Sequence, residues 1–221
     1  MKKILLLLLG LLIIIGILLF WVTSTNKRVN LNTATINSLT TEKISLNDPH
    51  AVNFSIRTAI VEIKSGPSPQ LKLTNISNNQ YKVIQDQHSL TIAEKDANAH
   101  QIEIGKSPTI TLILPQKDLS SLKIDQLNGT LKLNNLIVNQ FDVFHHNGTT
   151  LANNLTITKN GQFTKNNGST TLNHLTVSGL AVDVKTGQFQ LNGQKQKNHY
   201  RQNAGTGLTI NSGSGQVKVN R

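Results

Sequence analysis

The residues best suited to binding chemistry lie near the C-terminus, where basic side chains gather. Acidic residues end at Asp183, and beyond it come Lys185, Lys195, Lys197, Arg201, Lys218 and Arg221. Three of these basic residues share a polar insertion, residues 193–205, with one tyrosine. Positive charge on a flexible loop attracts phosphate-rich polymers and anionic lipid headgroups. The sequence therefore predicts contacts to an anionic polymer from Lys195, Lys197, Tyr200 and Arg201.

The same insertion has a second interpretation that needs no ligand. Lysines and other polar residues at the end of a sheet prevent an edge strand from pairing with other molecules. Residues 193–205 would then be a solvated loop that protects the open end of the fold. The sequence leaves both interpretations open.

Carboxylate pairs would indicate a glycan-cleaving enzyme, since inverting glycosidases hold two carboxyl groups about 6.5–9.5 Å apart. In the repeats described below, Asp125 and Asp183 share a column, but three strand spacings place them roughly 14 Å apart. Asp142 falls in a different column. We therefore predict no catalytic residues, and a carbohydrate-active enzyme is the least favoured function.

Histidines and glycine-rich motifs predict no metal or cofactor site. His145 and His146 are adjacent, so on a strand they point to opposite faces and cannot readily hold one ion together. We interpret both as solvent-facing. The chain has no cysteine, no calcium-binding glycine-rich repeat, no P-loop and no dinucleotide fingerprint.

The segments that carry these residues repeat with a period near 20 residues. The glycines Gly129, Gly148, Gly168 and Gly187 are separated by 19, 20 and 19 residues, and apolar residues alternate around each one. A fifth copy, residues 208–220, aligns on Gly215. This period, with two-residue apolar alternation inside each copy, predicts a β-solenoid in which each copy covers the apolar edge of its neighbour.

Asparagine occupies one column of every copy, five residues after the glycine. Equal positions in stacked copies lie roughly 4.8 Å apart, which is close enough for side-chain amides to bond one another. We interpret the column as a structural ladder and not as a binding site. Its members are Asn134, Asn153, Asn173, Asn192 and Asn220.

The N-terminus predicts a membrane anchor. Residues 4–22 are uncharged and largely apolar, close to the ~20 residues that span a bilayer as a helix. Lys2, Lys3 and Trp21 flank this segment, with a slight basic-residue bias for an N-terminus inside the cell. A cleaved secretory signal, whose apolar region is about 7–15 residues long, is the alternative. We divide the chain into an anchor (1–25), a polar linker (26–44), irregular strands (45–121) and regular rungs (122–221), with the solenoid spanning 45–221.

Three motifs follow one another after the linker. They are an irregular strand pair (Phe54–Ile56 and Val61–Ile63), a strand that ends in Leu-Pro (Thr111–Pro115) and the rungs that begin at Leu122. In this order they resemble the adhesin-like β-strand-repeat domain family of bacterial envelope proteins, over about residues 45–220. The resemblance implies a single-stranded right-handed β-helix or two-sheet β-roll behind one transmembrane helix, outside the cell membrane. The family offers no catalytic residues to carry over.

Charge and resemblance together favour binding over catalysis. The chain has 22 basic and 11 acidic residues, and without Lys2 and Lys3 it keeps a charge of 20 − 11 = +9. We expect a single-pass bacterial membrane protein whose extracytoplasmic, non-catalytic, adhesin-like module binds an anionic envelope polymer or an envelope protein. A structural or accessory partner in an envelope-stress or membrane-protein system is the alternative. Nucleic acid is not an expected partner outside the membrane.

Overall fold

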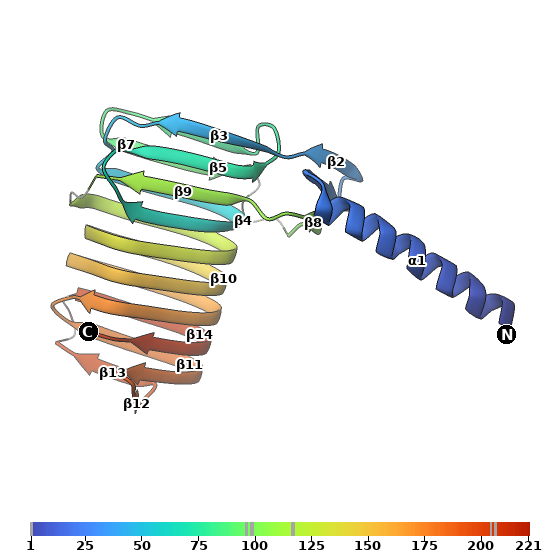
Figure 1. Ribbon diagram of the computed structural model, residues 1–221. Coiled ribbons are helices and arrows are strands. Elements are labelled where there is room, and N and C mark those ends of the chain that lie inside the picture. Colours follow the sequence, from blue (N-terminus) through green and yellow to red (C-terminus); the bar gives the residue numbers. More distant parts are fainter. Residues whose placement is uncertain (1, 96, 98–99, 116–117, 204, 206) are drawn as a thin grey trace.

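The computed structural model describes residues 2–95, 97, 100–115, 118–203, 205 and 207–221. The described part begins with a helix, α1 (Lys2–Ser24), and continues as strands joined by turns (Figure 1). The prediction of a mostly β chain behind one N-terminal apolar helix is confirmed.

The strands differ greatly in length because some pass around the stack without interruption. β10 is the longest and appears in Figure 1 as several stacked bands. The strands are β1 (Lys27–Asn30), β2 (Thr35–Ser38), β3 (Thr40–Ser45), β4 (Ala51–Ser65), β5 (Gln70–Ile76), β6 (Tyr81–Gln85), β7 (Ser89–Glu94), β8 (Glu103–Gly105), β9 (Thr109–Leu114), β10 (Leu119–Thr176), β11 (Leu180–Leu191), β12 (Gln194–Gln196), β13 (His199–Gln202) and β14 (Gly207–Val219).

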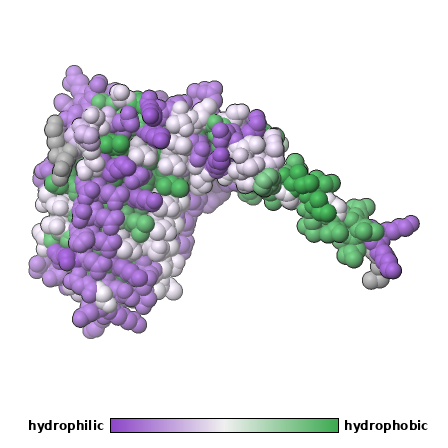
Figure 2. All heavy atoms as spheres, viewed as in Figure 1, coloured by the Kyte–Doolittle hydropathy of each residue, from purple (hydrophilic) through white to green (hydrophobic). Residues whose placement is uncertain are grey.

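Helix α1 is long and apolar enough to cross a membrane, judged by length and composition. Its side chains are almost all exposed, and within the helix Val22 alone is buried. Figure 2 shows this apolar surface beside a largely polar face of the β-structure. An apolar surface of this extent is stable in water only when lipid or another protein covers it.

A small antiparallel sheet with the strand order β2-β1-β8 joins the helix to the rest of the chain. The polar linker predicted for residues 26–44 is instead folded, because β1, β2 and most of β3 form there. Polar residues suggested an open tether, yet Arg28 and Asn30 are buried against the β-structure. Their partners lie far away in sequence, so the local pattern could not reveal them.

The large sheet is a stack of parallel turns of the chain. β4 pairs with the first part of β10, the last part of β10 pairs with β14, and β14 pairs with β11. Glycines of successive turns approach closely: a Cβ at Gly148 would lie 2.0 Å from the carbonyl oxygen of Gly129. The φ angle of Gly148 is 122°, a conformation that glycine adopts without a steric penalty. The regular glycine spacing is therefore a consequence of stacking.

The C-terminal copy does not stack in sequence order. β14 lies between the last turn of β10 and β11, so Gly215 packs on Gly168, and Gly187 packs on Gly215. The expectation that the Gly187 copy follows the Gly168 copy directly is wrong. The insertion makes the observed order possible, because it turns back along the outer edge of β11 before β14 begins. Asp125 and Asp183 are consequently one turn further apart than predicted from the sequence.

The core runs through the stack as a column of inward-facing aliphatic and aromatic side chains. Its largest fully buried members include Phe54, Phe163 and Phe189. At the end nearer α1, the strands β9, β5 and β3 continue the sheet beyond β4, and β7 with β6 pairs beside them. The large sheet thus has two distinct ends, one at β3 and one at β11 with β12 and β13 on its outer edge.

Candidate functional site

The predicted anionic-polymer contacts lie on two short strands that cover the outer edge of β11. β12 and β13 both pair antiparallel with β11, with Lys195 opposite Gln190 and Arg201 opposite Ala181. The open edge of the last parallel turn is therefore paired along most of its length. This geometry is the one expected of an insertion that protects an edge.

The four predicted residues separate into two pairs. The ring of Tyr200 packs on Phe189, with centroids 5.4 Å apart, and Arg201 Nη2 lies 2.6 Å from Asp183 Oδ2. Both side chains thus hold β13 on β11. Lys195 and Lys197 are exposed, and no described residue forms a salt bridge with either. Their charges are the ones left for a ligand.

Asp183, the last acidic residue in the sequence, lies at this end of the stack. Hydrogen bonds from Arg201 and His199 keep the pKa of the Asp183 carboxyl below its usual range, against a smaller opposing effect of burial. His199 Nδ1 lies 2.5 Å from Asp183 Oδ1. The carboxylate is thus charged and already bonded on both oxygens.

A groove of about 500 Å³ lies beside these strands. Gly213 belongs to its lining, and a Cβ there would lie 2.4 Å from the carbonyl oxygen of Asn166. The neighbouring backbone thus keeps this position free of a side chain. Its lining residues are Thr164, Lys165, Asn166, Asp183, Val184, Lys185, Asn198, His199, Asn211 and Ser212. Lys165, Val184 and Ser212 are buried, so the side chains available to a ligand provide amides, one hydroxyl, one amine, an imidazole and a carboxylate. We call it the C-terminal groove.

An aromatic pair adjoins the C-terminal groove on the preceding turn. The rings of Phe144 and His146 are stacked with centroids 3.8 Å apart. Asn166 Nδ2 lies 3.3 Å from His146 Nδ1, which links the pair to the groove lining. His146 Nε2 lies 3.1 Å from Asp125 Oδ1. Flat rings beside amides, a hydroxyl and an ammonium group suit a sugar ring that carries a negative charge.

The asparagine column forms a chain of side-chain hydrogen bonds on the surface of the stack. Asn153 Nδ2 donates to Asn134 Oδ1 at 2.9 Å, and Asn173 donates in the same way to Asn153 at 3.0 Å. Asn220 then donates to Asn173 at 2.9 Å, because β14 follows β10 in the stack. Asn192 lies beyond Asn220 and accepts from the backbone N–H of Arg221. Each amide thus bonds a neighbouring turn.

The interior of the stack contains polar residues that the sequence placed on the surface. His145 is fully buried, so its interpretation as solvent-facing is wrong, whereas His146 is half-buried. Thr150 Oγ1 lies 2.7 Å from His145 Nδ1, and Lys165 Nζ lies 3.1 Å from the same nitrogen. Lys165 Nζ also donates to the carbonyl oxygen of Gly148 at 3.0 Å. His145 lies two residues after the inward-facing Val143, and because side chains of a strand alternate between its two faces, His145 points inward as well.

Burial shifts the pKa values of both interior bases. It lowers the pKa of Lys165 to about 7. Burial, with the nearby Lys165 charge, lowers the pKa of His145 to about 3. No carboxylate is bonded to either side chain in the described part of the chain. Both groups thus favour their neutral forms.

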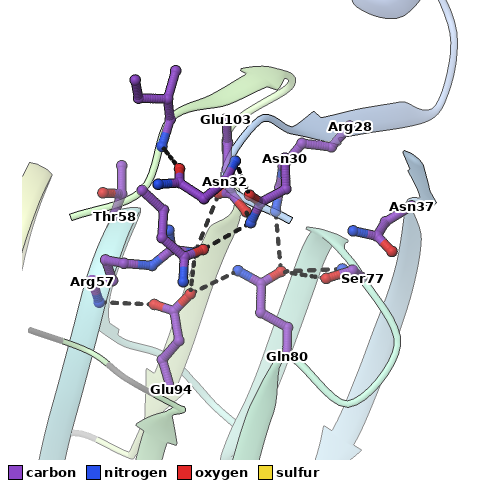
Figure 3. A network of polar contacts seen from close by, with 12 residues as sticks. Arg28, Asn30, Asn32, Asn37, Arg57, Thr58, Ser77, Gln80, Glu94 and Glu103 are labelled. Atoms are coloured by element: carbon purple, nitrogen blue, oxygen red, sulfur yellow. Dashed lines mark hydrogen bonds and ion pairs between the residues drawn. The ribbon is translucent and has the colours of Figure 1, made fainter. Parts of the chain in front are cut away.

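A second polar cluster lies where the small sheet meets the large one, and we call it the helix-side network (Figure 3). The buried guanidinium of Arg57 contacts Glu94 at 3.1 Å and Glu103 at 3.2 Å. Gln80 Nε2 donates to Glu94 Oε1 at 3.1 Å, and Gln80 Oε1 accepts from Arg28 Nη1 at 3.1 Å. The network thereby links β1, β4, β7, β8 and the turn before β6.

Charge pairing decides the state of this network. Burial alone would lower the pKa of Arg57, but attraction to Glu94 and Glu103 raises it above the usual range. Burial lowers the pKa of Arg28, with Glu103 opposing that shift. Two carboxylates meet here, yet both bond the same guanidinium, so the arrangement is that of a structural ion cluster. The described residues contain no group of three or more His, Cys, Asp or Glu that could hold a metal ion.

Sequence reasoning missed Arg57, although a signal was present. Inward positions run Val52, Phe54 and Ile56, and then the phase shifts so that Ala59 and Val61 point inward. A buried charge at such a phase shift indicates a partner from elsewhere in the chain, because buried charges are paired.

Comparison with known proteins identifies relatives of the β-structure. The family Toastrack DUF4097 matches residues 51–221. A "putative cell adhesion protein" from Clostridium sporogenes has a similar fold, with a TM-score of 0.58 and 15% identity over 83% of this chain and 99% of that one. A "putative adhesin" from Bacteroides fragilis is 9% identical over 83% of this chain and 97% of its own, with a TM-score of 0.34. No curated protein has significant similarity to the chain. The resemblance to adhesin-like β-strand-repeat domains is confirmed.

Proposed function

Because the chain belongs to the Toastrack DUF4097 family, we propose that it is a membrane-anchored binding protein of the bacterial cell envelope. Helix α1 anchors it as a single span, with residues 1–25 as the anchor, and the β-structure lies outside the cytoplasm. The exposed apolar surface of α1 supports the anchor. The similar structure from Clostridium sporogenes, described as a "putative cell adhesion protein", supports a role in binding.

The fold assignment within this proposal is a β-solenoid over residues 45–221, a right-handed β-helix or two-sheet β-roll. In-register parallel pairing of β4, β10, β14 and β11 supports it. The small sheet is a folded junction between anchor and solenoid. It takes the place of an open linker.

The ligand we propose is an anionic polysaccharide of the envelope, bound at the C-terminal groove. One observation carries this proposal: a groove of sugar-compatible side chains lies beside exposed lysines that form no salt bridge with any described residue. Lys185 belongs to the groove lining, and Lys197 directly precedes Asn198, which also lines it. Asn166, Asn198 and Asn211 would bond sugar hydroxyls, and the lysines would face carboxylate or phosphate groups. We assign no catalytic role to Asp183, because Arg201 and His199 already bond it.

Titration calorimetry of the full chain in lipid nanodiscs tests this function. We expect a uronic-acid polysaccharide to bind at low salt and a neutral polysaccharide of similar linkage to bind more weakly. The double substitution Lys195→Gln and Lys197→Gln should weaken binding roughly tenfold, since each exposed ion pair contributes up to about 1 kcal/mol. Added salt should reduce the difference because it screens exposed charges.

The matched control removes two exposed lysines outside the insertion, Lys43→Gln on β3 and Lys123→Gln on β10, with the same change in net charge. Equal losses of affinity in both double variants would show that the polysaccharide is attracted by positive charge anywhere on the surface, and would reject a binding site at this end of the stack. Absence of binding at low salt would reject the polysaccharide itself.

A further inference from the structure

The small sheet β2-β1-β8 has two chemically different faces. Successive strand residues point to opposite sides, so Val29 and Leu31 share one face while Arg28 and Asn30 share the other. Val29 is paired with Ile36 on β2 and with Ile104 on β8. Ile102, two residues before Ile104, falls on that same apolar side. One face is thus lined by aliphatic side chains.

The polar face is turned toward the protein and fixed there. Arg28 is 3% exposed and Asn30 is 7% exposed. Arg28 donates to the carbonyl oxygens of Asn75 and Lys106 and to the side chain of Gln80. Asn30 Nδ2 donates to Gln101 Oε1 at 2.8 Å. These contacts hold the sheet with its polar side inward, which directs its aliphatic side away from the body.

The aliphatic face is correspondingly open. Leu31 is 52% exposed, Ile36 is 57% exposed and Ile102 is 63% exposed. A soluble sheet normally has the reverse arrangement, with the apolar face inward and the polar face in water. The exposed aliphatic side chains gathered on this sheet form a continuous patch, in contrast to a single exposed residue such as Ile84 on β6.

The patch is continuous with the anchor helix. A hollow of about 320 Å³ between them is lined by Leu18, Leu19, Trp21 and Val22 of α1 and by Val29, Leu31, Ile36 and Ile104 of the sheet, together with Ile15. Tryptophan prefers the level of the lipid headgroups, where its ring meets both hydrocarbon and water. A patch that shares a hollow with Trp21 therefore lies at the depth where a bilayer ends.

We propose that this face of the small sheet rests in the outer leaflet of the bilayer, with Leu31, Ile36 and Ile102 in contact with lipid hydrocarbon. The inference rests on the proposed membrane span of α1 and adds a second, strand-based contact. Two contacts fix the inclination of the solenoid to the membrane, whereas one helix would leave it free to swing. The helix-side network then transmits that fixed inclination to β4 and the stacked turns.

The test places a single tryptophan at chosen depths in the full chain. In a Trp21→Phe background, Ile36→Trp and Ile102→Trp are compared with Ile84→Trp, whose parent residue is 41% exposed on β6. The chains are reconstituted in phosphatidylcholine–phosphatidylglycerol liposomes with brominated acyl chains, because bromine quenches a ring only on contact. We expect fluorescence at positions 36 and 102 to fall roughly twofold, and fluorescence at position 84 to stay within about a tenth.

The outcomes separate the inference from the function on which it rests. Trp21 in the unmodified chain, the only tryptophan present, reports on insertion of α1 by itself. Quenching of Trp21 without quenching at positions 36 and 102 would overturn the inference and leave the anchor intact. Protection of positions 36 and 102 from aqueous iodide without lipid quenching would indicate a protein partner, and also overturns it. Circular dichroism of each variant verifies that the strands have formed.

Discussion

Two buried cations, Arg57 and Lys165, are accommodated in opposite ways at two places in the same fold. Arg57 lies in the helix-side network between Glu94 and Glu103, which raise the pKa of its guanidinium. Lys165 lies inside the regular turns, bonded to His145 and a carbonyl oxygen, and burial lowers the pKa of its amine to about 7. Arg57 stays charged because it is paired, whereas Lys165 has no carboxylate partner among the described residues and loses its proton already around neutral pH.

The difference follows from what surrounds each site. Arg57 lies at a junction of irregular strands, where β7 and β8 can each bring a carboxylate to it. Lys165 lies in a repeated column, whose other members come from equivalent positions of the neighbouring turns. The neighbours are His145 on one side and Ser212 on the other. Irregular structure can thus assemble a charge pair that regular stacking does not offer here.

The largest expected effect is the loss of stability in Arg57→Met. Removing the guanidinium leaves Glu94 and Glu103 without their cation in a buried place. Breaking a buried pair from one side typically costs about 3–5 kcal/mol. Urea unfolding of the full chain in detergent micelles, followed by circular dichroism of the strands, measures the change.

The control for Arg57→Met is Lys64→Met on the same strand β4. Lys64 pairs with Glu62 at 3.4 Å, but its side chain is 39% exposed. We expect a loss of less than about 1 kcal/mol there, as for other exposed pairs. Similar losses for both variants would mean that pairing in the helix-side network is no more important than pairing at the surface.

The next effect concerns pH and has the opposite sign. The pKa of Lys165 is about 7 in the folded chain, against an ordinary lysine value of 10.5, so the unfolded chain binds more protons between those values. Stability therefore rises as pH increases from about 7 towards 10.5. Below pH 7 both states are protonated and the cost of burying the charge is fully present. We expect Lys165→Met to be more stable than the parent at pH 6, by roughly 2–4 kcal/mol.

Urea titrations of parent and Lys165→Met at pH 6, 8 and 10 check this expectation. The advantage of the variant should shrink steadily with pH. His145, whose pKa is about 3 in the folded chain against a usual value of 6.5, changes stability below pH 6.5, so of these three conditions it contributes at pH 6 and not at pH 8 or 10. A constant difference between the two proteins across this range would show that Lys165 is paired after all and would remove the contrast with Arg57.

A smaller effect is expected from Gln80→Ala, which tests whether Arg57 and Arg28 act as one network. Gln80 donates to Glu94 and accepts from Arg28, so its loss leaves both groups short of a partner. Leaving a buried polar group unpaired costs about 1–3 kcal/mol. Gln140→Ala on β10 is the control, because Gln140 is exposed. If Gln80→Ala and Arg57→Met together lose the sum of their separate effects, the two sites are independent.

The sequence was sufficient for features that depend on neighbours in the repeat. Glycine spacing predicted the close backbone contacts at Gly148, and the asparagine column predicted positions whose amides do meet in successive turns. These two predictions were possible because every copy of the repeat meets the same neighbouring backbone at the glycine and the same neighbouring amide at the asparagine. The apolar alternation around each glycine likewise predicted the strands of the regular rungs.

The features that the sequence did not predict depend on contacts between residues that are distant in sequence or out of phase with the strand alternation. β14 lies between the last turn of β10 and β11, while β12 and β13 of the insertion occupy the other edge of β11, and repeat periodicity does not predict this order. Arg57 finds its carboxylates on strands that belong to no repeat. His145 could have been placed correctly from strand phase, but its polarity suggested solvent. Inside a stack that provides internal hydrogen-bond partners, the position of a residue in the strand alternation predicts its burial better than its polarity does.

The smallest expected effect concerns Arg201, a cation that is paired like Arg57 but exposed. Arg201 bonds Asp183 at 2.6 Å, a shorter contact than either ion pair of Arg57, yet both side chains are 37% exposed. Water screens such a pair, so Arg201→Gln should lose only about 0–1 kcal/mol, and the loss should fade at high salt. The pKa of the Asp183 carboxyl should rise towards its usual value in Arg201→Gln, because the hydrogen bond from Arg201 is the largest cause of its lowering. NMR titration of the Asp183 side chain and urea unfolding measure both quantities. A loss as large as that of Arg57→Met would mean that contact distance, and not burial, controls the strength of charge pairs in this fold.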